Sequence, residues 1–179
     1  MRHLSLTALL LLGFSTSVSA AELKPEKIYI ADAKKNGRYL KSGLLTGGGQ
    51  AIQKCVIQGI RRSVNPGFER IVIDLEGKMN SETPAVSRAP YYQVAILSAE
   101  KQLQVSFWGQ PQLEFDAEKV IQEFKKSKVI QNILLLPRLE EKVWTFALDL
   151  KAEPTVEIFE LTQPIRLILD IKYGPRPKP

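Results

Sequence analysis

The stretch that decides the fold is Ile165-Arg166-Leu167-Ile168-Leu169-Asp170-Ile171-Lys172. A strand with this alternation places Ile165, Leu167, Leu169 and Ile171 on one face and Arg166, Asp170 and Lys172 on the other. We therefore expect a half-buried strand. Residues 70–75 and 144–150 follow the same pattern, and each carries one Asp opposite its large apolar residues. Three such stretches in a short chain predict antiparallel sheet.

Eight strands are predicted in the body of the chain, and turn residues such as Asn65-Pro66-Gly67 separate neighbours. The strands are expected at residues 55–62, 68–76, 91–98, 102–108, 130–136, 142–151, 155–161 and 165–172. One helix is predicted at residues 117–126, because Asp116 can cap its first turn and Val120 and Phe124 recur on one face.

The order of these elements contains a repeat. The four strands of residues 55–108 are matched by the four strands of residues 130–172, and the helix joins the two sets. Four strands with one apolar face cannot bury that face alone, so two similar halves should pack face to face. The predicted fold class is all-β with one added helix: a β-sandwich of two antiparallel sheets formed from two similar four-stranded halves, spanning residues 51–174.

The two ends of the chain differ from this domain. Residues 1–20 combine a basic start, a short apolar centre and a small-residue exit at Ala20, which is typical of a cleaved secretory signal peptide. The apolar run is shorter than the ~20 residues that cross a bilayer, so we expect a periplasmic protein with no transmembrane segment in the mature chain. Residues 21–50 are predicted to be a flexible basic linker ending in Gly47-Gly48-Gly49, although residues 28–30 could add a short strand. Residues 175–179 are predicted to be an extended Pro-rich tail.

Composition limits the chemistry. The chain has 25 Lys and Arg against 19 Asp and Glu, a net charge of +6, which becomes +5 when Arg2 leaves with the signal peptide. This balance favours anionic partners such as cell-wall polymers, but it is as common in proteins whose charge only maintains solubility. The only histidine, His3, also leaves, so Ser-His-Asp catalysis, Cys-His catalysis and His-ligated zinc are excluded. We predict no enzymatic activity, no catalytic residues, no cofactor and no metal site.

Two stretches resemble a known family. Residues 69–77 have the order x-Arg-Ile-Val-Ile-Asp-Leu-Glu-Gly, and residues 161–171 read Leu-Thr-Gln-Pro-Ile-Arg-Leu-Ile-Leu-Asp-Ile. Both are similar to the AMIN domain, the N-terminal localisation domain of cell-wall amidases, and the resemblance covers residues 55–174. It implies a periplasmic β-sandwich that binds peptidoglycan or targets a larger envelope machine. The section 111–128 is longer than the family's typical connection. We expect a stand-alone domain that acts by binding.

The predicted function is therefore a non-catalytic cell-envelope module that binds peptidoglycan and localises itself or a partner. The alternative is a structural or adaptor component of a pilus, secretin or other envelope protein complex, held through sheet edges. Because the protein is exported, no nucleic acid partner is expected.

The candidate ligand contacts are arginines, which grip a carboxylate through two donors, together with one lysine and several aromatic residues. They are Arg61, Arg62, Arg70, Tyr91, Tyr92, Trp108, Arg166 and Lys172. Arg70 and Arg166 have a competing structural role, because each lies four residues before an Asp on the same strand face and can pair across strands. Alternation requires that one of Tyr91 and Tyr92 points outward.

Overall fold

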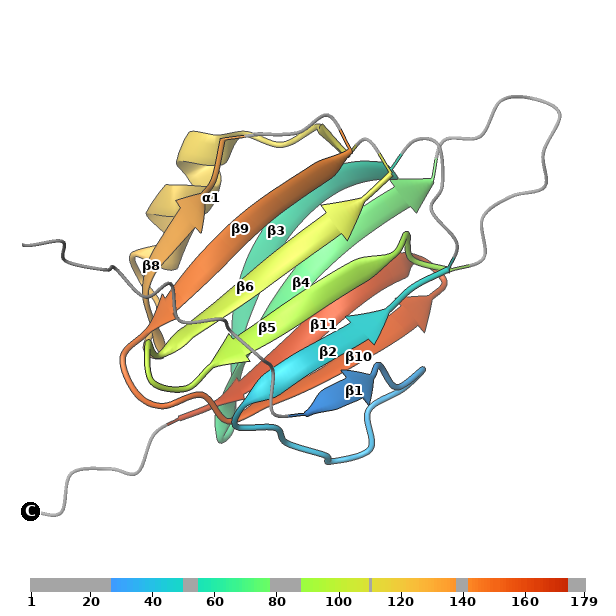
Figure 1. Ribbon diagram of the computed structural model, residues 1–179. Coiled ribbons are helices and arrows are strands. Elements are labelled where there is room, and N and C mark those ends of the chain that lie inside the picture. Colours follow the sequence, from blue (N-terminus) through green and yellow to red (C-terminus); the bar gives the residue numbers. More distant parts are fainter. Residues whose placement is uncertain (1–26, 50–54, 78–87, 110, 138–141, 174–179) are drawn as a thin grey trace, which may run out of the picture.

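Two β-sheets stacked face to face make up the part of the chain that the computed structural model describes, residues 27–49, 55–77, 88–109, 111–137 and 142–173 (Figure 1). The elements follow one another as β1 (Ile28–Ile30), β2 (Gly43–Gly47), β3 (Cys55–Asn65), β4 (Phe68–Gly77), β5 (Tyr92–Leu97), β6 (Gln102–Trp108), β7 (Gln112–Leu113), α1 (Ala117–Phe124), β8 (Ile130–Leu135), β9 (Val143–Leu150), β10 (Val156–Thr162) and β11 (Ile165–Lys172). The predicted sandwich, its eight strands and its helix are confirmed.

The predicted halves, however, do not each form a sheet. One sheet has the order β1-β2-β5-β6-β9-β8 and the other has the order β10-β11-β4-β3-β7. Each half therefore gives one hairpin to each sheet, and the second strand of every hairpin lies in the centre. The sheets are also mixed, because β1 pairs with β2 and β7 pairs with β3 in parallel. The prediction of two wholly antiparallel sheets was wrong at these short outer strands.

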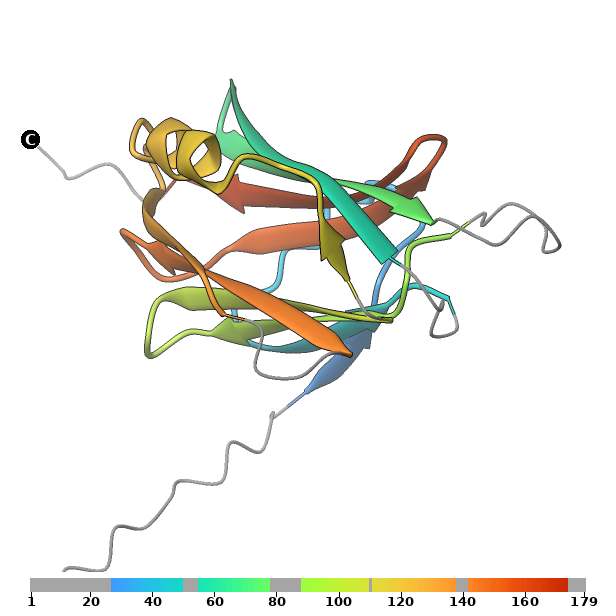
Figure 2. The ribbon, with the colours of Figure 1, turned by 90° about the horizontal axis from the view of Figure 1, so that it is seen from above.

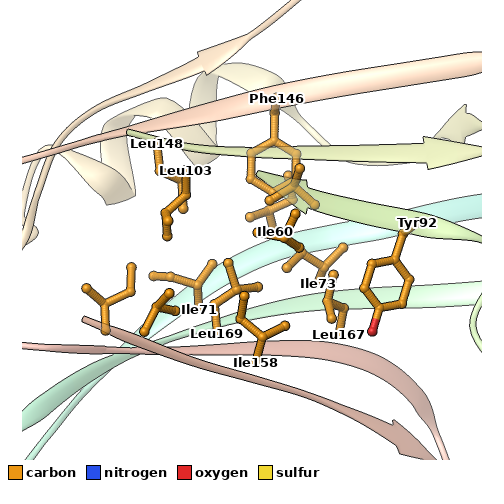
Figure 3. Packing of buried hydrophobic residues seen from close by; sticks show 14 of the residues in the cluster. Ile60, Ile71, Ile73, Tyr92, Leu103, Phe146, Leu148, Ile158, Leu167 and Leu169 are labelled. Carbon is orange, nitrogen blue, oxygen red and sulfur yellow. The ribbon is translucent and has the colours of Figure 1, made fainter. Parts of the chain in front are cut away.

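The core lies between the inner faces of the two sheets. Phe146, Leu148 and Leu103 project from the six-stranded sheet toward Ile71 and Leu169 of the five-stranded sheet (Figure 3). Period-2 alternation brings these residues to one side of their strands, and every one of them is almost completely buried. This apolar burial is the main stabilising contribution to the fold.

Strand β11 is more deeply buried than its alternation predicts. Leu167 and Leu169 are fully buried in the core, as expected. On the opposite face, Ile168 packs with Val72 and Phe159 in a second apolar cluster, and all three are also buried. The expectation of a half-buried strand was wrong, because apolar side chains of the neighbouring strands pack around Ile168, and a segment from the N-terminal part of the chain binds the buried Asp170 on the same face.

That segment comprises residues 31–42, between β1 and β2, and we call it the strap. Leu40 exchanges two backbone hydrogen bonds with Val156 of β10, at 2.8 and 2.9 Å, and the Glu160 N–H donates to the carbonyl of Asp32 at 2.9 Å. The strap thereby closes one side of the sandwich, between the outer strands β1 and β10 (Figures 1 and 2). The prediction of a flexible linker was wrong for residues 27–49, while the short strand at residues 28–30 is confirmed.

Helix α1 closes the opposite side. The Asp116 side chain accepts a hydrogen bond from the Lys119 N–H at 3.1 Å, and this cap fixes the start of the helix as predicted. Val120 and Phe124 are buried between the sheets, and the helix contacts β8 and β3. It ends at Phe124, two residues before the predicted end. No helix among the described residues is long and apolar enough to span a bilayer. The predicted signal peptide and Pro-rich tail lie outside the described residues.

Candidate functional site

The eight predicted ligand contacts do not share one surface. They divide among the outer face of the five-stranded sheet (Arg61, Arg70, Arg166 and Lys172), the outer face of the six-stranded sheet (Tyr91 and Trp108) and the interior (Arg62 and Tyr92). The two outer faces have different chemistry.

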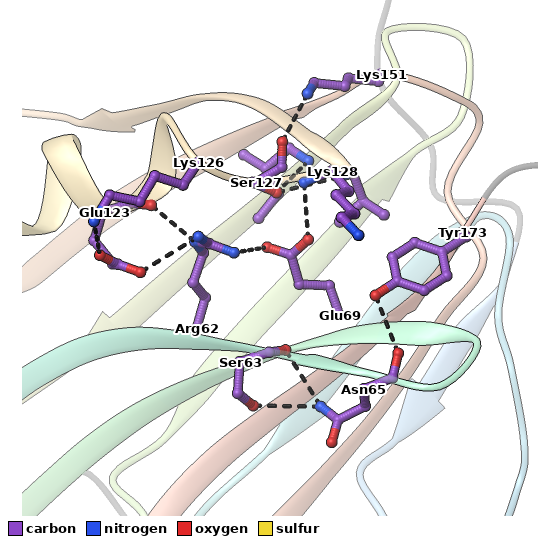
Figure 4. Close-up of polar contacts among 12 residues, drawn as sticks. Arg62, Ser63, Asn65, Glu69, Glu123, Lys126, Ser127, Lys128, Lys151 and Tyr173 are labelled. Atoms are coloured by element: carbon purple, nitrogen blue, oxygen red, sulfur yellow. Dashed lines mark hydrogen bonds and ion pairs between the residues drawn. The ribbon is translucent and has the colours of Figure 1, made fainter.

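Arg62 and Tyr92 are structural. The Arg62 side chain is 7% exposed and donates to the Glu69 carboxylate at 3.0 Å and to the Glu123 carbonyl at 2.8 Å, which ties β3 to the end of α1 (Figure 4). Tyr92 is fully buried, and its hydroxyl donates to Glu160 at 3.0 Å. Burial, followed by the nearby charge of Glu160, raises the pKa of Tyr92. The prediction that these two residues contact a ligand at the surface was wrong.

The outer face of the five-stranded sheet, which we call the ionic face, is organised by two reciprocal ion pairs. Strands β4 and β11 are antiparallel, with Arg70 opposite Asp170 and Arg166 opposite Asp74. Arg70 donates two hydrogen bonds to Asp170 at 2.7 and 2.8 Å, and Arg166 donates one to Asp74 at 2.8 Å. The predicted cross-strand pairing of both arginines is confirmed.

The Asp170 end of this arrangement is the more deeply buried. The Asp170 side chain is fully buried and accepts a third hydrogen bond from Lys35 of the strap at 2.7 Å. This bond raises the pKa of Lys35 despite some opposing desolvation. The strap is also held at Glu157, which is buried and accepts the N–H groups of Asn36 and Gly37 at 2.8 and 2.6 Å. The ion pairs therefore fasten the strap to the sheet.

At the other end, Asp74 is shared by two arginines. Arg61 donates to it at 2.6 and 3.1 Å, in addition to the bond from Arg166. Burial alone would raise the pKa of Asp74, but the hydrogen bonds from Arg61 and Arg166 outweigh burial and lower it. A lowered carboxyl pKa contributes stability above its ordinary value and loses that contribution as the pH falls through the folded value. Asp74 therefore stabilises the fold at neutral pH.

The cations of the ionic face are thus engaged within the chain. Lys172, the last predicted contact on this face, lies over the Tyr39 ring with its Nζ 3.9 Å from the ring centroid. Because carboxylates or rings of the protein already engage these cations, an anionic ligand would have to displace internal partners. The ionic face is better explained as part of the fold than as a binding site.

The outer face of the six-stranded sheet, which we call the amide face, is nearly uncharged. Its outward side chains on β2, β5, β6 and β9 are Leu44, Thr46, Gln93, Ala95, Leu97, Gln102, Gln104, Ser106, Trp108, Val143, Thr145, Ala147 and Asp149. Asp149 is the one charged residue among them, in a chain in which 25% of residues are charged. Most of these positions are partly exposed. Charged side chains begin in the flanking turns, as at Lys101 and Lys142.

Hydrogen bonds orient the polar groups of the amide face. Gln104 donates to the Gln102 amide oxygen at 2.7 Å, and Gln102 in turn donates to Asp149 at 2.8 Å. The hydroxyls of Ser106 and Thr145 lie 2.7 Å apart on neighbouring strands. A primary amide can form several hydrogen bonds, so these contacts fix the side chains while leaving capacity for a ligand.

An aromatic pair borders these polar groups at one end of β5 and β6. The rings of Tyr91 and Trp108 have centroids 5.1 Å apart and are inclined by 58°. The backbone N–H of Trp108 donates to the backbone carbonyl of Tyr91 at 3.0 Å, and the Gln93 side chain donates to the Tyr91 hydroxyl at 2.7 Å. Both aromatic residues are partly exposed, as expected for an outward-facing Tyr91. On the amide face, the structure thus brings together two of the eight predicted contacts.

The glutamines and hydroxyls of the amide face were not predicted as site residues. The sequence nevertheless indicates one polar strand face, because every second position of strand β6 carries a side chain that can form hydrogen bonds. These side chains are Gln102, Gln104, Ser106 and Trp108. What the sequence did not reveal is that β5, β6 and β9 are neighbours, which places their outward side chains on one surface.

A separate apolar groove lies on the helix side of the sandwich, near the outer strands β7 and β8. It has a volume of about 450 Å³ and is lined by Leu113, Phe115, Ala117, Leu135, Leu136, Pro137 and Trp144. Leu113 and Leu136 are 41% and 39% exposed, which is high for leucine. Across the described residues, no group of His, Cys, Asp or Glu side chains is arranged to hold a metal ion.

Comparison with known proteins finds no relative of this chain. No protein-family model matches the chain, and no curated protein matches it.

Proposed function

We propose that this protein is a non-catalytic module of the cell envelope that binds peptidoglycan through its amide face and so localises itself or a partner at the wall. The observation that carries the proposal is the amide face itself, a broad sheet surface of amides, hydroxyls and one aromatic pair. The resemblance of residues 55–174 to the AMIN domain and the predicted signal peptide support the same function.

The chemistry of the amide face suits a polysaccharide. Sugar hydroxyls and acetamido groups donate and accept hydrogen bonds without formal charge, and Gln93, Gln104 and Ser106 can do both. Tyr91 and Trp108 add apolar ring surface against which the C–H face of a sugar can lie, with polar ring atoms at the edge. Because both rings also pack against each other, little side-chain freedom is lost on binding.

We expect Trp108→Ala or Tyr91→Ala to weaken retention of the mature protein on purified sacculi by about tenfold or more, since central aromatic residues dominate binding surfaces and ~1.4 kcal/mol corresponds to tenfold. Co-sedimentation with sacculi at physiological salt measures the effect. The matched control is Phe68→Ala, which removes a partly exposed ring from the ionic face. Equal retention of all three variants and the unchanged protein would contradict the proposal.

A second candidate function, an adaptor that holds an extended segment of another envelope protein, is favoured by the apolar groove. Strand β8 is an outer strand with the uncharged sequence IQNILL, and the groove lies beside it. A strand added to β8 could place alternate apolar side chains in the groove. The opposite outer strand, β1, is protected, because Arg38 donates to the Ile30 carbonyl at 3.0 Å and pairs with Asp32.

The adaptor function predicts one dominant protein partner in crosslinked cells that survives muramidase digestion. Leu136→Asp should abolish this crosslink, because a carboxylate in the groove would be desolvated without a counter-ion. Val64→Asp is the control, since Val64 is also an exposed apolar residue, at 53%, but lies on β3 outside the groove. Loss of the partner with both variants, or with neither, would contradict a specific role for the groove.

A further inference from the structure

We infer that the amide face recognises the neutral glycan strand of peptidoglycan, lying across the β-strands, and not the charged stem peptide. This inference rests on the proposed function and specifies which part of the polymer binds. Two independent observations carry it: the charge of the face, and the register of its polar side chains.

The first observation concerns charge. A stem peptide carries carboxylates, and those with a diamino acid also carry ammonium groups, so a surface that selects it should offer partners of both signs. Among the described outward positions of β2, β5, β6 and β9, only Asp149 is charged, and it already accepts a hydrogen bond from Gln102. The amide face therefore complements a polymer backbone that has no formal charge where it contacts the sheet.

The second observation concerns register. Thr46, Gln93, Ser106 and Thr145 are successive cross-strand partners on β2, β5, β6 and β9, so they form one row perpendicular to the strands. Neighbouring strands lie ~4.8 Å apart, which gives the row a length of roughly 14 Å. A β-linked sugar chain advances by a similar step per ring. A glycan along this row therefore meets one hydroxyl or amide side chain per sugar.

The aromatic pair agrees with this orientation. Tyr91 and Trp108 lie directly beside the row on the same two central strands, two residues from Gln93 and Ser106. A glycan that follows the row can thus place one face of a sugar against a ring while its polar edge meets the row. A chain along β5 or β9 would instead meet the apolar Ala95 or Ala147 beside polar positions, and along β6 the polar side chains recur only every two residues, ~6.6 Å apart.

Competition for sacculus binding tests this inference with defined probes. The first is glycan strands freed of stem peptides by an amidase, which leaves a lactyl carboxylate on every second sugar. The second is free stem peptide, and the third is a series of β-1,4-linked N-acetylglucosamine oligomers, which carry no charge. We expect glycan strands to displace the mature protein, stem peptide to change retention less than about twofold, and oligomer affinity to rise at least about tenfold from two sugars to four and then level off. Retention should change less than about twofold between ~50 and ~300 mM salt.

A double substitution of two residues in the row provides a second test. Gln93→Ala with Thr145→Ala should lower affinity for the four-sugar oligomer about tenfold or more, whereas Gln58→Ala with Ser63→Ala, likewise one amide and one hydroxyl but on β3 of the other sheet, should not change it. Displacement by stem peptide but not by peptide-free glycan, or a steep loss with salt, would overturn the inference and leave wall binding intact. Failure to retain the unchanged protein on sacculi would overturn the proposed function and the inference together.

Discussion

Asp170→Asn is expected to lower the free energy of unfolding by about 3 kcal/mol at pH 7, because removing one partner of a buried ion pair leaves the other without a counter-charge. Asp170 is fully buried and is bound by both Arg70 and Lys35. An Asn carries no charge and replaces one carboxylate oxygen by an NH2 group, so Arg70 loses its counter-charge and at least one of its two hydrogen bonds. Arg70 and Lys35 are 31% and 40% exposed, which lets water compensate in part and places the effect at the lower end of the range for such changes. Urea unfolding measures it.

The matched control is Asp74→Asn, which alters the reciprocal pair on the same two strands. Asp74 is 24% exposed, and its partners Arg61 and Arg166 are 54% and 32% exposed. Because solvent screens these ion pairs more strongly, the free energy of unfolding should fall by only about 1 kcal/mol. Because hydrogen bonding raises the pKa of Lys35, that side chain stays charged well above pH 7 and the comparison is not confounded by its titration. If the two variants lose equal free energy of unfolding, burial of Asp170 does not determine the size of the effect.

Gly48→Ala is expected to destabilise the fold by about 3 kcal/mol or more, through a combination of steric clash and backbone strain. Gly48 has φ +84°, and a Cβ on it would collide with the Pro90 carbonyl. Relieving the clash would also disturb the hydrogen bond from the Gly48 N–H to Glu160 at 2.7 Å. Glu160 is buried, so loss of that donor leaves a poorly solvated carboxylate. Thermal or urea unfolding measures the change.

Gly67→Ala separates the two causes of that effect. Gly67 has a nearly identical φ of +83°, but no atom lies within 4 Å of its added Cβ, so only the strain of about 1–2 kcal/mol remains. If Gly48→Ala proves too unstable to purify, Gly49→Ala keeps the test open, because its Cβ would make only an ordinary 3.6 Å contact with the Ala89 carbonyl and should be tolerated. Equal losses of unfolding free energy in Gly48→Ala and Gly67→Ala would show that the clash with Pro90 contributes nothing.

Local sequence pattern predicted most of the elements but not how they combine. Alternation located β4 and β11, and the cap at Asp116 located α1, because each signal lies within a few residues of the chain. Pairing of β4 with β11 joins residues 100 apart, as in the Arg70–Asp170 bond, and no local pattern specifies such a partner. The assumption that each half forms its own sheet failed for this reason.

The glycine triplet shows how one pattern can have two causes. Gly47-Gly48-Gly49 was interpreted as a linker because glycines lack side chains to pack. In the fold, the lack of a side chain is what lets this segment approach Pro90 and the Tyr92 hydroxyl. Close approach of two backbones is a tertiary property, so the sequence alone could not distinguish it from flexibility.

The candidate site was predictable only in part. Tyr91, Tyr92 and Trp108 were all candidates, and alternation required one of the two tyrosines to point outward without identifying which. The arginines were selected for a charge that the fold uses internally. Arg70 and Arg166 contact carboxylates of the same chain, and the competing structural role assigned to them from the sequence was correct. The uncharged polar side chains of β5, β6 and β9 gain significance only once these strands are neighbours.

The placement of β11 has a consequence for biogenesis. It is the last strand among the residues that the structure describes, yet it lies between β10 and β4 near the middle of the five-stranded sheet. A nascent polypeptide that stops short of Ile165 leaves β4 without β11 beside it and leaves β10 with only its short bridges to Asp32 and Leu40 of the strap. Completion of the described sandwich must therefore wait until synthesis has passed Lys172, the end of β11.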